Sequence, residues 1–307
     1  MSRNLKGNLL LILAALLWGI SFVMQDKAGE VLPSPFAING IRSWIGVLTL
    51  LPLVSMRGKK AGTGIFEKDK VRRRDLILAG VFCGIFMCIA TNFQQFGMLT
   101  YPPEAATSGR SGFITTLYIV LVPLLGLVIG KRPTANVWLS VALATLGMFL
   151  LCVNGGGGGI YIGDIIVLVC AFAFALQIMC IDKFSDRVDG VKLSMVQLMV
   201  GGALSLVMML IFEKPTSAQI LAATPYMLYL GIFSCGVAYT LQIIGQQLSE
   251  NPTVASVIMS LESVFAALSG MVFSGETLSP RELSGCAIIF AAIVFVQLPS
   301  RKSKNEA

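Results

Sequence analysis

The chain has 307 residues, of which 55% are hydrophobic and 13% are charged, and its mean hydropathy is +0.81. A soluble protein of this length could not cover so much apolar surface, so the composition predicts an integral membrane protein with no soluble domain. The sequence contains no histidine, which excludes histidine metal sites, serine–histidine catalytic pairs and histidine proton relays. The net charge is +7, and the basic residues lie in the loops, which is typical of topology signals and not of a nucleic-acid site.

Ten apolar segments predict ten transmembrane helices, because about 20 apolar residues span a bilayer as an α-helix. In chain order they are 8–27, 36–56, 75–99, 103–130, 134–153, 162–182, 191–212, 222–247, 252–274 and 280–298. Arg3 and Lys6 precede the first segment as they would in a signal peptide, but the apolar run is long and no small-residue cleavage site follows it. We therefore interpret it as the first membrane helix.

The basic residues are distributed unevenly between the two sides. With the N-terminus inside, eighteen of the 23 Lys and Arg residues lie on the inner side, and only Lys27, Lys214 and Arg281 lie on the outer side. This bias predicts that both termini are cytoplasmic.

The two halves of the sequence resemble each other in a consistent order. The matching pairs are Gly7 with Gly163, Trp18 with Phe174, Gln95 with Gln242, Leu117 with Glu262 and Gly130 with Gly275. Five helices per half is an odd number, so the second copy must enter the membrane in the opposite direction. Two inverted five-helix repeats are typical of secondary transporters, whose site lies near the midplane between the halves. The predicted domains are a first repeat at 1–154, a glycine-rich joint at 155–161, a second repeat at 162–298 and a tail at 299–307.

Three charged residues, Arg42, Arg110 and Glu262, lie away from the ends of the predicted helices, where a charge is costly and usually functional. Glu262 stands near the middle of its helix, and it could couple protons or bind a cationic group, or be held neutral and fix packing. Arg110, about 10 Å inside the membrane at 1.5 Å per residue from Pro103, could act in binding or as a gate, or extend to the surface. Arg42 could contact solute or be anchored to backbone carbonyls or to Asp26.

Polar and aromatic side chains at helical spacing suggest the wall of a cavity for an uncharged or zwitterionic organic solute. Hydroxyl groups in segment 103–130 could equally serve close helix packing, and an ordinary packing role is open for the aromatic residues. The predicted substrate-binding residues are Trp18, Arg42, Asn92, Gln95, Arg110, Ser111, Tyr118, Gln177, Tyr239, Gln242 and Glu262. Gln94, Thr115 and Phe174 lie beside them on the same helices. We expect no metal site, no cofactor and no nucleic-acid partner.

Several motifs resemble the EamA-type branch of the drug/metabolite transporter superfamily. The opening ALLWGISFV is similar to the family's Trp-Gly-x-x-Phe helix, and Leu261-Glu262-Ser263-Val264 through Gly275-Glu276 is similar to its Leu-Glu-Pro-Val…Gly-Glu pattern. Ser263 departs from the usual proline, and Lys131 stands where the second half has Glu276. The resemblance implies ten helices in two inverted repeats, with the fifth and tenth at the periphery and the other eight around a central cavity.

We therefore expect a secondary active transporter of small organic metabolites, amino acids or related solutes, in a bacterial inner membrane. Export is one direction that the resemblance allows, and proton coupling would use Glu262. A passive facilitator or a lipid- or drug-moving protein of the same fold is the alternative. An intramembrane enzyme is disfavoured because histidine is absent and Asp164 lacks the Gly-x-Gly-Asp spacing of a membrane aspartyl protease.

Overall fold

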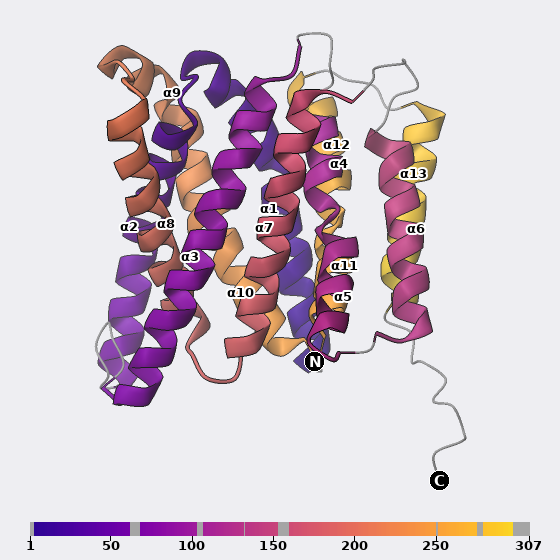
Figure 1. The fold of residues 1–307 in the computed structure, drawn as a ribbon, viewed down its shortest axis with the longest axis horizontal. Coiled ribbons are helices and arrows are strands. Elements are labelled where there is room, and N and C mark those ends of the chain that lie inside the picture. The colour runs from indigo at the N-terminus through magenta and orange to yellow at the C-terminus, as the bar shows by residue number, and fades with distance from the viewer. Residues whose placement is uncertain are drawn as a thin grey trace.

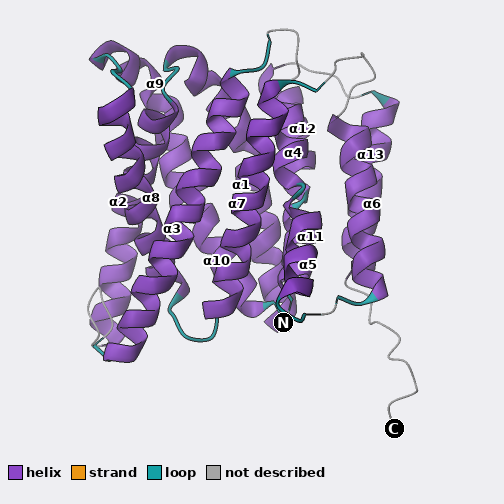
Figure 2. Cartoon of the chain, in the orientation of Figure 1, coloured by secondary structure: helices purple, strands orange, loops and turns teal. Residues whose placement is uncertain are grey.

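A computed structural model describes residues 3–61, 68–102, 107–131, 133–152, 160–249, 251–274 and 279–296. Within these ranges every regular element is a helix and none is a strand (Figure 2). In chain order the elements are α1 (Arg3–Val31), α2 (Pro35–Ala61), α3 (Lys70–Leu99), α4 (Thr107–Thr116), α5 (Tyr118–Val128), α6 (Ala135–Cys152), α7 (Ile162–Phe184), α8 (Gly190–Phe212), α9 (Ser217–Tyr229), η1 (Leu230–Ala238), α10 (Tyr239–Leu248), α11 (Pro252–Met259), α12 (Leu261–Ser274) and α13 (Pro280–Val296).

Eight helical segments of the described residues are long and apolar enough to cross a membrane. The shorter apolar helix α6 and the 17-residue helix α13 complete the ten predicted helices. In Figure 1 the helices run between two ends of the bundle. We call the end at which α1 begins the proximal end and the opposite one the distal end. The predicted tail 299–307 and most of the predicted joint 155–161 lie outside the described residues.

Three of the predicted spans are not single uninterrupted α-helices, contrary to the sequence reading. Segment 103–130 contains α4 and α5 with a break at Leu117, and segment 252–274 contains α11 and α12 with a break at Ser260. Segment 222–247 passes through the π-helix η1 between α9 and α10. Breaks of this kind in mid-membrane are tolerated where the backbone faces protein or a cavity.

The break at Ser260 has a local cause in three successive serines. The hydroxyls of Ser256, Ser260 and Ser263 each donate to the carbonyl oxygen three residues earlier, at 2.8, 2.6 and 2.8 Å. Side chains that bond the backbone in this way compete with the regular helical pattern and bend the helix. The break leaves Glu262 in the first turn of α12 and not in the middle of a continuous helix.

Helices of one repeat pack on helices of the other in matching ways. α3 packs along α7, and its counterpart α10 packs along α1; α2 packs on η1, and its counterpart α8 packs on α3. Helices α6 and α13 pack on each other at one edge of the bundle (Figure 1). The fold is therefore that of two inverted five-helix repeats, with the fifth and tenth helices peripheral as expected.

At the distal end, α3 and α7 cross closely through glycines. A Cβ added to Gly97 would lie 2.4 Å from Val167 Cγ2 and 3.1 Å from the carbonyl oxygen of Gly163. Only a residue without a side chain allows the two backbones to approach this far.

The proximal crossing of α1 and α10 repeats this arrangement. A Cβ added to Gly245 would lie 2.8 Å from Leu11 Cγ and 3.1 Å from the carbonyl oxygen of Gly7. Gly7 is therefore the counterpart of Gly163, as the sequence repeat predicts, and Gly245 is the counterpart of Gly97. These two glycine crossings are therefore equivalent and lie at opposite ends of the bundle.

Candidate functional site

A small cavity lies between the two repeats. Its wall combines aromatic, apolar and polar side chains from Trp18, Ser21, Phe22, Gln25, Arg42, Gln94, Thr115, Tyr118, Phe174, Ile178, Ser234, Tyr239, Gln242, Met259 and Glu262. Its volume is about 40 Å³. A water molecule needs roughly 10–15 Å³ of such space, so the cavity holds a few waters and no organic solute. The cavity in this structure is therefore too small for an organic solute.

Arg42 and Glu262 are the two charged residues in this wall. Both are buried, with relative exposures of 3% and 5%. The ion pairs between described side chains are Arg57–Asp189, Arg110–Asp164 and Lys131–Asp182, so neither cavity charge is neutralised by another of these side chains. Glu262 lies in the first turn of α12, where the helix dipole stabilises a negative charge.

The structure brings six of the predicted substrate-binding residues to the cavity. They are Trp18, Arg42, Tyr118, Tyr239, Gln242 and Glu262. The Trp18 and Tyr239 rings meet edge to face with centroids 5.1 Å apart, so packing and cavity-lining roles coincide there. The hydroxyl of Tyr118 is buried in the cavity wall beside the Glu262 carboxyl.

Asn92 and Gln95 are buried away from the cavity. Asn92 Nδ2 donates to the Cys88 carbonyl oxygen at 2.8 Å and to Ser205 Oγ at 2.9 Å, which joins α3 to α8. Gln95 Nε2 donates to the Gln25 carbonyl oxygen at 3.3 Å, which joins α3 to α1. Both side chains connect helices in this state.

Gln94, not Gln95, lines the cavity beside Gln242. The sequence repeat paired Gln242 with Gln95, one residue further along. This shift of one residue between the repeats originates in η1, because a π-helix closes its turns with i→i+5 bonds and accommodates an additional residue. The glycine crossings then make Gln94, three residues before Gly97, the counterpart of Gln242, three residues before Gly245. The sequence match of Gln95 with Gln242 is therefore wrong by one position.

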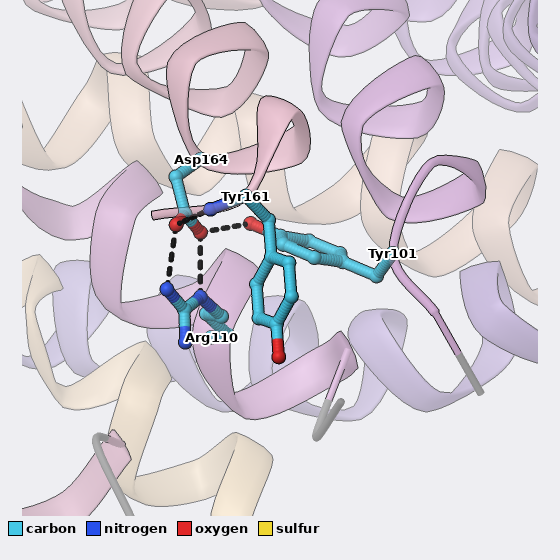
Figure 3. Close-up of polar contacts among 4 residues, drawn as sticks. All are labelled: Tyr101, Arg110, Tyr161 and Asp164. Atoms are coloured by element: carbon cyan, nitrogen blue, oxygen red, sulfur yellow. Dashed lines mark hydrogen bonds and ion pairs between the residues drawn. The ribbon is translucent and has the colours of Figure 1, made fainter. Parts of the chain in front are cut away.

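Arg110 lies at the distal end and not in the cavity wall. It occupies the first turn of α4, and its guanidinium binds Asp164 at the start of α7 through two parallel hydrogen bonds of 2.6 Å, from Nε and Nη2 (Figure 3). Its Cζ lies 4.6 Å from the centre of the Tyr161 ring. Ser111, the next residue, is fully buried, and its hydroxyl has no hydrogen-bond partner in the described part of the chain.

Asp164 is the centre of a polar cluster that closes the distal end. Besides Arg110 it accepts hydrogen bonds from the Tyr101 hydroxyl and from the Tyr161 backbone N–H, both at 2.9 Å (Figure 3). Burial, together with the bond to Asp164, raises the pKa of Tyr101 well above its ordinary value, so the phenol stays a donor. We call Tyr101, Arg110, Tyr161 and Asp164 the distal latch, because they fasten α4 and the end of α3 to α7.

Gln177 lies in a chain of buried amides on the proximal side of the cavity. It donates to Gln197 Oε1 at 3.2 Å and accepts from Gln242 Nε2 at 3.3 Å. Of these three residues only Gln242 lines the cavity.

Sequence reasoning missed several of the residues that matter at these sites. Ser21, Gln25 and Ser234 contribute polar groups to the cavity, and the sequence contains no motif that marks them. Asp164 was considered only as a protease residue. Its position three residues after Tyr161, before an apolar run, has the spacing of an acidic helix-start residue, but nothing local identifies Arg110 as its partner.

A bundle of inverted repeats with interrupted helices around a polar cavity is an architecture that many membrane transporters share. The chain belongs to the EamA-like transporter family, whose profile matches residues 5–153 and again residues 161–298. This confirms the resemblance seen in the sequence, and it makes the chain a multi-pass membrane transporter of the drug/metabolite type that handles small solutes.

Curated relatives and solved structures agree with this assignment. An uncharacterized transporter of Archaeoglobus fulgidus is 30% identical over 304 residues, which are 96% of this chain and 87% of that protein. YwfM of Bacillus subtilis is 24% identical over 98% of both chains. The threonine/homoserine exporter RhtA of Escherichia coli K12 is 31% identical over 183 residues, 57% of this chain and 58% of RhtA. One crystal structure with 19% identity has the same fold, with a TM-score of 0.74 over 95% of this chain and 96% of that one.

Proposed function

We propose that this chain is a secondary active exporter of small zwitterionic metabolites, and that amino acids with a hydrogen-bonding side chain, such as threonine, are its substrates. The observation that carries the proposal is the presence of Arg42 and Glu262 in one closed cavity, each without an ion-pair partner among the described side chains. Two buried charges of opposite sign suit a molecule that carries a carboxylate and an ammonium group. The similarity to RhtA supports the same class of solute.

Alternating access supplies the mechanism. The cavity of about 40 Å³ cannot admit an amino acid while both glycine crossings are packed, so one end must separate at a time. We place the proximal end in the cytoplasm, because the basic loops lie there, and the membrane in question is the bacterial cytoplasmic membrane. The distal latch is then the outer gate. Glu262 is the group that exchanges a proton for the ammonium of the solute.

Counterflow of radiolabelled threonine in proteoliposomes tests this proposal. We expect Arg42→Gln and Glu262→Gln each to abolish exchange, because each leaves one charge of the solute without a partner. The matched controls are Arg57→Gln and Glu282→Gln, which alter charges outside the cavity and should exchange normally. Exchange at the unsubstituted rate in both cavity variants would remove these residues from the mechanism.

Concentrative transport separates a coupled carrier from a passive facilitator of the same fold. An imposed pH gradient should drive threonine against its concentration gradient in the unsubstituted protein. Glu262→Gln should remove this response. A rate that does not depend on the pH gradient would favour the facilitator.

A further inference from the structure

Four buried glutamines lie in the proximal half of the second repeat, and three of them are joined by hydrogen bonds. They are Gln177 of α7, Gln197 of α8 and Gln242 and Gln246 of α10, with relative exposures of 0%, 0%, 2% and 4%. Gln177 bonds both Gln197 and Gln242, and Gln246 lies one turn beyond Gln242 towards the proximal end. We call this set the glutamine column. It starts at the cavity, because Gln242 lines the cavity wall.

The glutamine column is poorly satisfied in the state described. Gln197 Nε2, Gln242 Oε1 and both amide atoms of Gln246 are buried without a hydrogen-bond partner in the described residues. Exchanging the oxygen and nitrogen of Gln246 would not help, because neither has a partner. Buried amides that serve only to join helices normally have their bonds satisfied. These side chains therefore retain unused capacity to bind water or a polar solute.

The inverted repeat identifies what the glutamine column corresponds to. A Cβ added to Gly84 would lie 2.8 Å from the Gln197 carbonyl oxygen, and one added to Gly231 would lie 3.0 Å from the Arg42 carbonyl oxygen. In both cases the residue three positions after this carbonyl lies closer still: Val200 Cβ is 2.7 Å from the Cβ added to Gly84, and Ile45 Cβ is 2.5 Å from the one added to Gly231. Gln197 is therefore the counterpart of Arg42.

Gln242 and Gln177 have counterparts in the cavity wall as well. The distal and proximal glycine crossings make Gln242 the counterpart of Gln94, and the same overlay that matches Gly163 with Gly7 matches Gln177 with Ser21. Ser21, Arg42 and Gln94 all line the cavity. Gln177, Gln197 and Gln242 are thus the proximal equivalents of three cavity-lining residues, and they are bonded to one another.

We propose that the glutamine column is a second, uncharged solute subsite, which becomes hydrated and lines the path when the proximal end opens. It would bind a neutral hydrogen-bonding group, such as the hydroxyl of threonine, and no second carboxylate, because Gln197 replaces Arg42. This proposal rests on the alternating access proposed above. It adds the side chains that select the solute on the cytoplasmic side.

Cysteine accessibility tests the proposal independently of transport. Gln197→Cys and Gln246→Cys are compared with Ser194→Cys, whose serine is buried one turn from Gln197 on α8 and is satisfied by Thr240 Oγ1 at 2.9 Å. A membrane-impermeant thiol reagent is applied to each face, and the unsubstituted chain sets the background of native cysteines. We expect both glutamine positions to react from the proximal face at least roughly tenfold faster than Ser194→Cys, because a proximal-open state populated to a few per cent exposes them. Threonine should slow the reaction.

The possible outcomes separate the two proposals. Fast labelling from the proximal face without threonine transport would support the glutamine column as part of the transport path and would reject threonine as the solute. Labelling as slow as at Ser194→Cys, with transport intact, makes the glutamine column ordinary packing and overturns the inference. In transport assays, Gln197→Leu and Gln246→Leu should lower the preference for threonine over valine, because a site that bonds the hydroxyl discriminates against its absence. An unchanged preference in both variants would reject the selective role.

Discussion

The distal and proximal halves of the bundle have the same design and different chemistry. Each closes through a glycine crossing, Gly97 with Gly163 at the distal end and Gly245 with Gly7 at the proximal end. The distal wall places Arg42 in the cavity, whereas its proximal counterpart is the neutral Gln197, which is bonded to Gln177.

This difference shows how an inverted repeat becomes directional. The geometry of opening is shared between the halves, because the backbone contacts are shared. Charge is not shared, since the cation that would hold a carboxylate lies on one side only. The distal crossing is also fastened by the Arg110–Asp164 ion pair. At the proximal crossing the corresponding residue is Asn8, which follows Gly7 as Asp164 follows Gly163.

The largest effect is expected from making the two walls alike. Arg42→Gln leaves neutral amides on both sides, so the protein should lose its preference for threonine over threonine amide, which lacks the carboxylate. Loss of a buried charge-assisted contact costs about 2–5 kcal/mol, or at least roughly 30-fold in affinity. Binding isotherms with the two ligands measure it, and Arg57→Gln is the control. An undiminished preference for threonine over threonine amide would mean that another group binds the carboxylate.

The second prediction concerns the distal latch. Asp164→Asn removes the charge and should shift the equilibrium towards the distal-open state by about 1–3 kcal/mol, or roughly 5–150-fold. Distances between spin labels on α4 and α7, measured in detergent and in lipid, report the shift. Arg110→Lys is the companion variant, since it keeps the charge and loses the two-pronged geometry. Unchanged distance distributions in Asp164→Asn would show that packing alone keeps this end closed.

A smaller and graded effect is expected at the glycine crossings. Gly97→Ala brings a methyl group to 2.4 Å from the stiff, β-branched Val167, whereas Gly245→Ala meets the more adaptable Leu11 at 2.8 Å. Overpacking costs typically about 1–3 kcal/mol, and we expect the distal variant to lie at the upper end of this range and the proximal variant at the lower end. Thermal unfolding in detergent ranks them. The reverse order would contradict the contact geometry.

The smallest effect concerns the starts of the equivalent helices α2 and α8. Asp189 caps α8 from within its own repeat, whereas α2 begins with the N–H groups of Phe36 and Ala37 donating to Glu213, at 3.0 and 2.9 Å. Burial raises the pKa of Glu213, and these two bonds lower it in part. Because the folded-state pKa is the higher one, the net contribution of Glu213 to stability is greatest below its ordinary pKa of about 4.3 and falls as pH rises through the raised value, where burial penalises the charged form.

Glu213→Gln should therefore flatten the pH dependence of the unfolding temperature in that window. The change should be slight, because the side chain is only half-buried. Asp189→Asn is the comparison at the start of α8. A pH profile of Glu213→Gln that follows the unsubstituted protein would assign the dependence to other groups.

Periodicity and composition predicted much of this fold, and the reasons are local. The apolar runs follow from lipid, which allows few solutions for a backbone. The order of matched residues follows from the internal repeat. The breaks at Leu117 and Ser260 were not predicted, because apolar continuity hides them. The role of Arg110 as a partner of Asp164 could not be predicted, since 54 residues separate them and neither segment contains a motif that indicates the other.

By itself the sequence determined the membrane class, the inverted repeat and the rarity of intramembrane charge, because burial in lipid restricts composition directly. Tertiary structure alone decided which polar residues meet. It placed Gln94 in the wall and Gln95 on a neighbouring carbonyl, because successive side chains on a helix point about 100° apart. It also placed Arg42 in the cavity wall and bonded its counterpart Gln197 to Gln177, because these positions depend on contacts between distant helices.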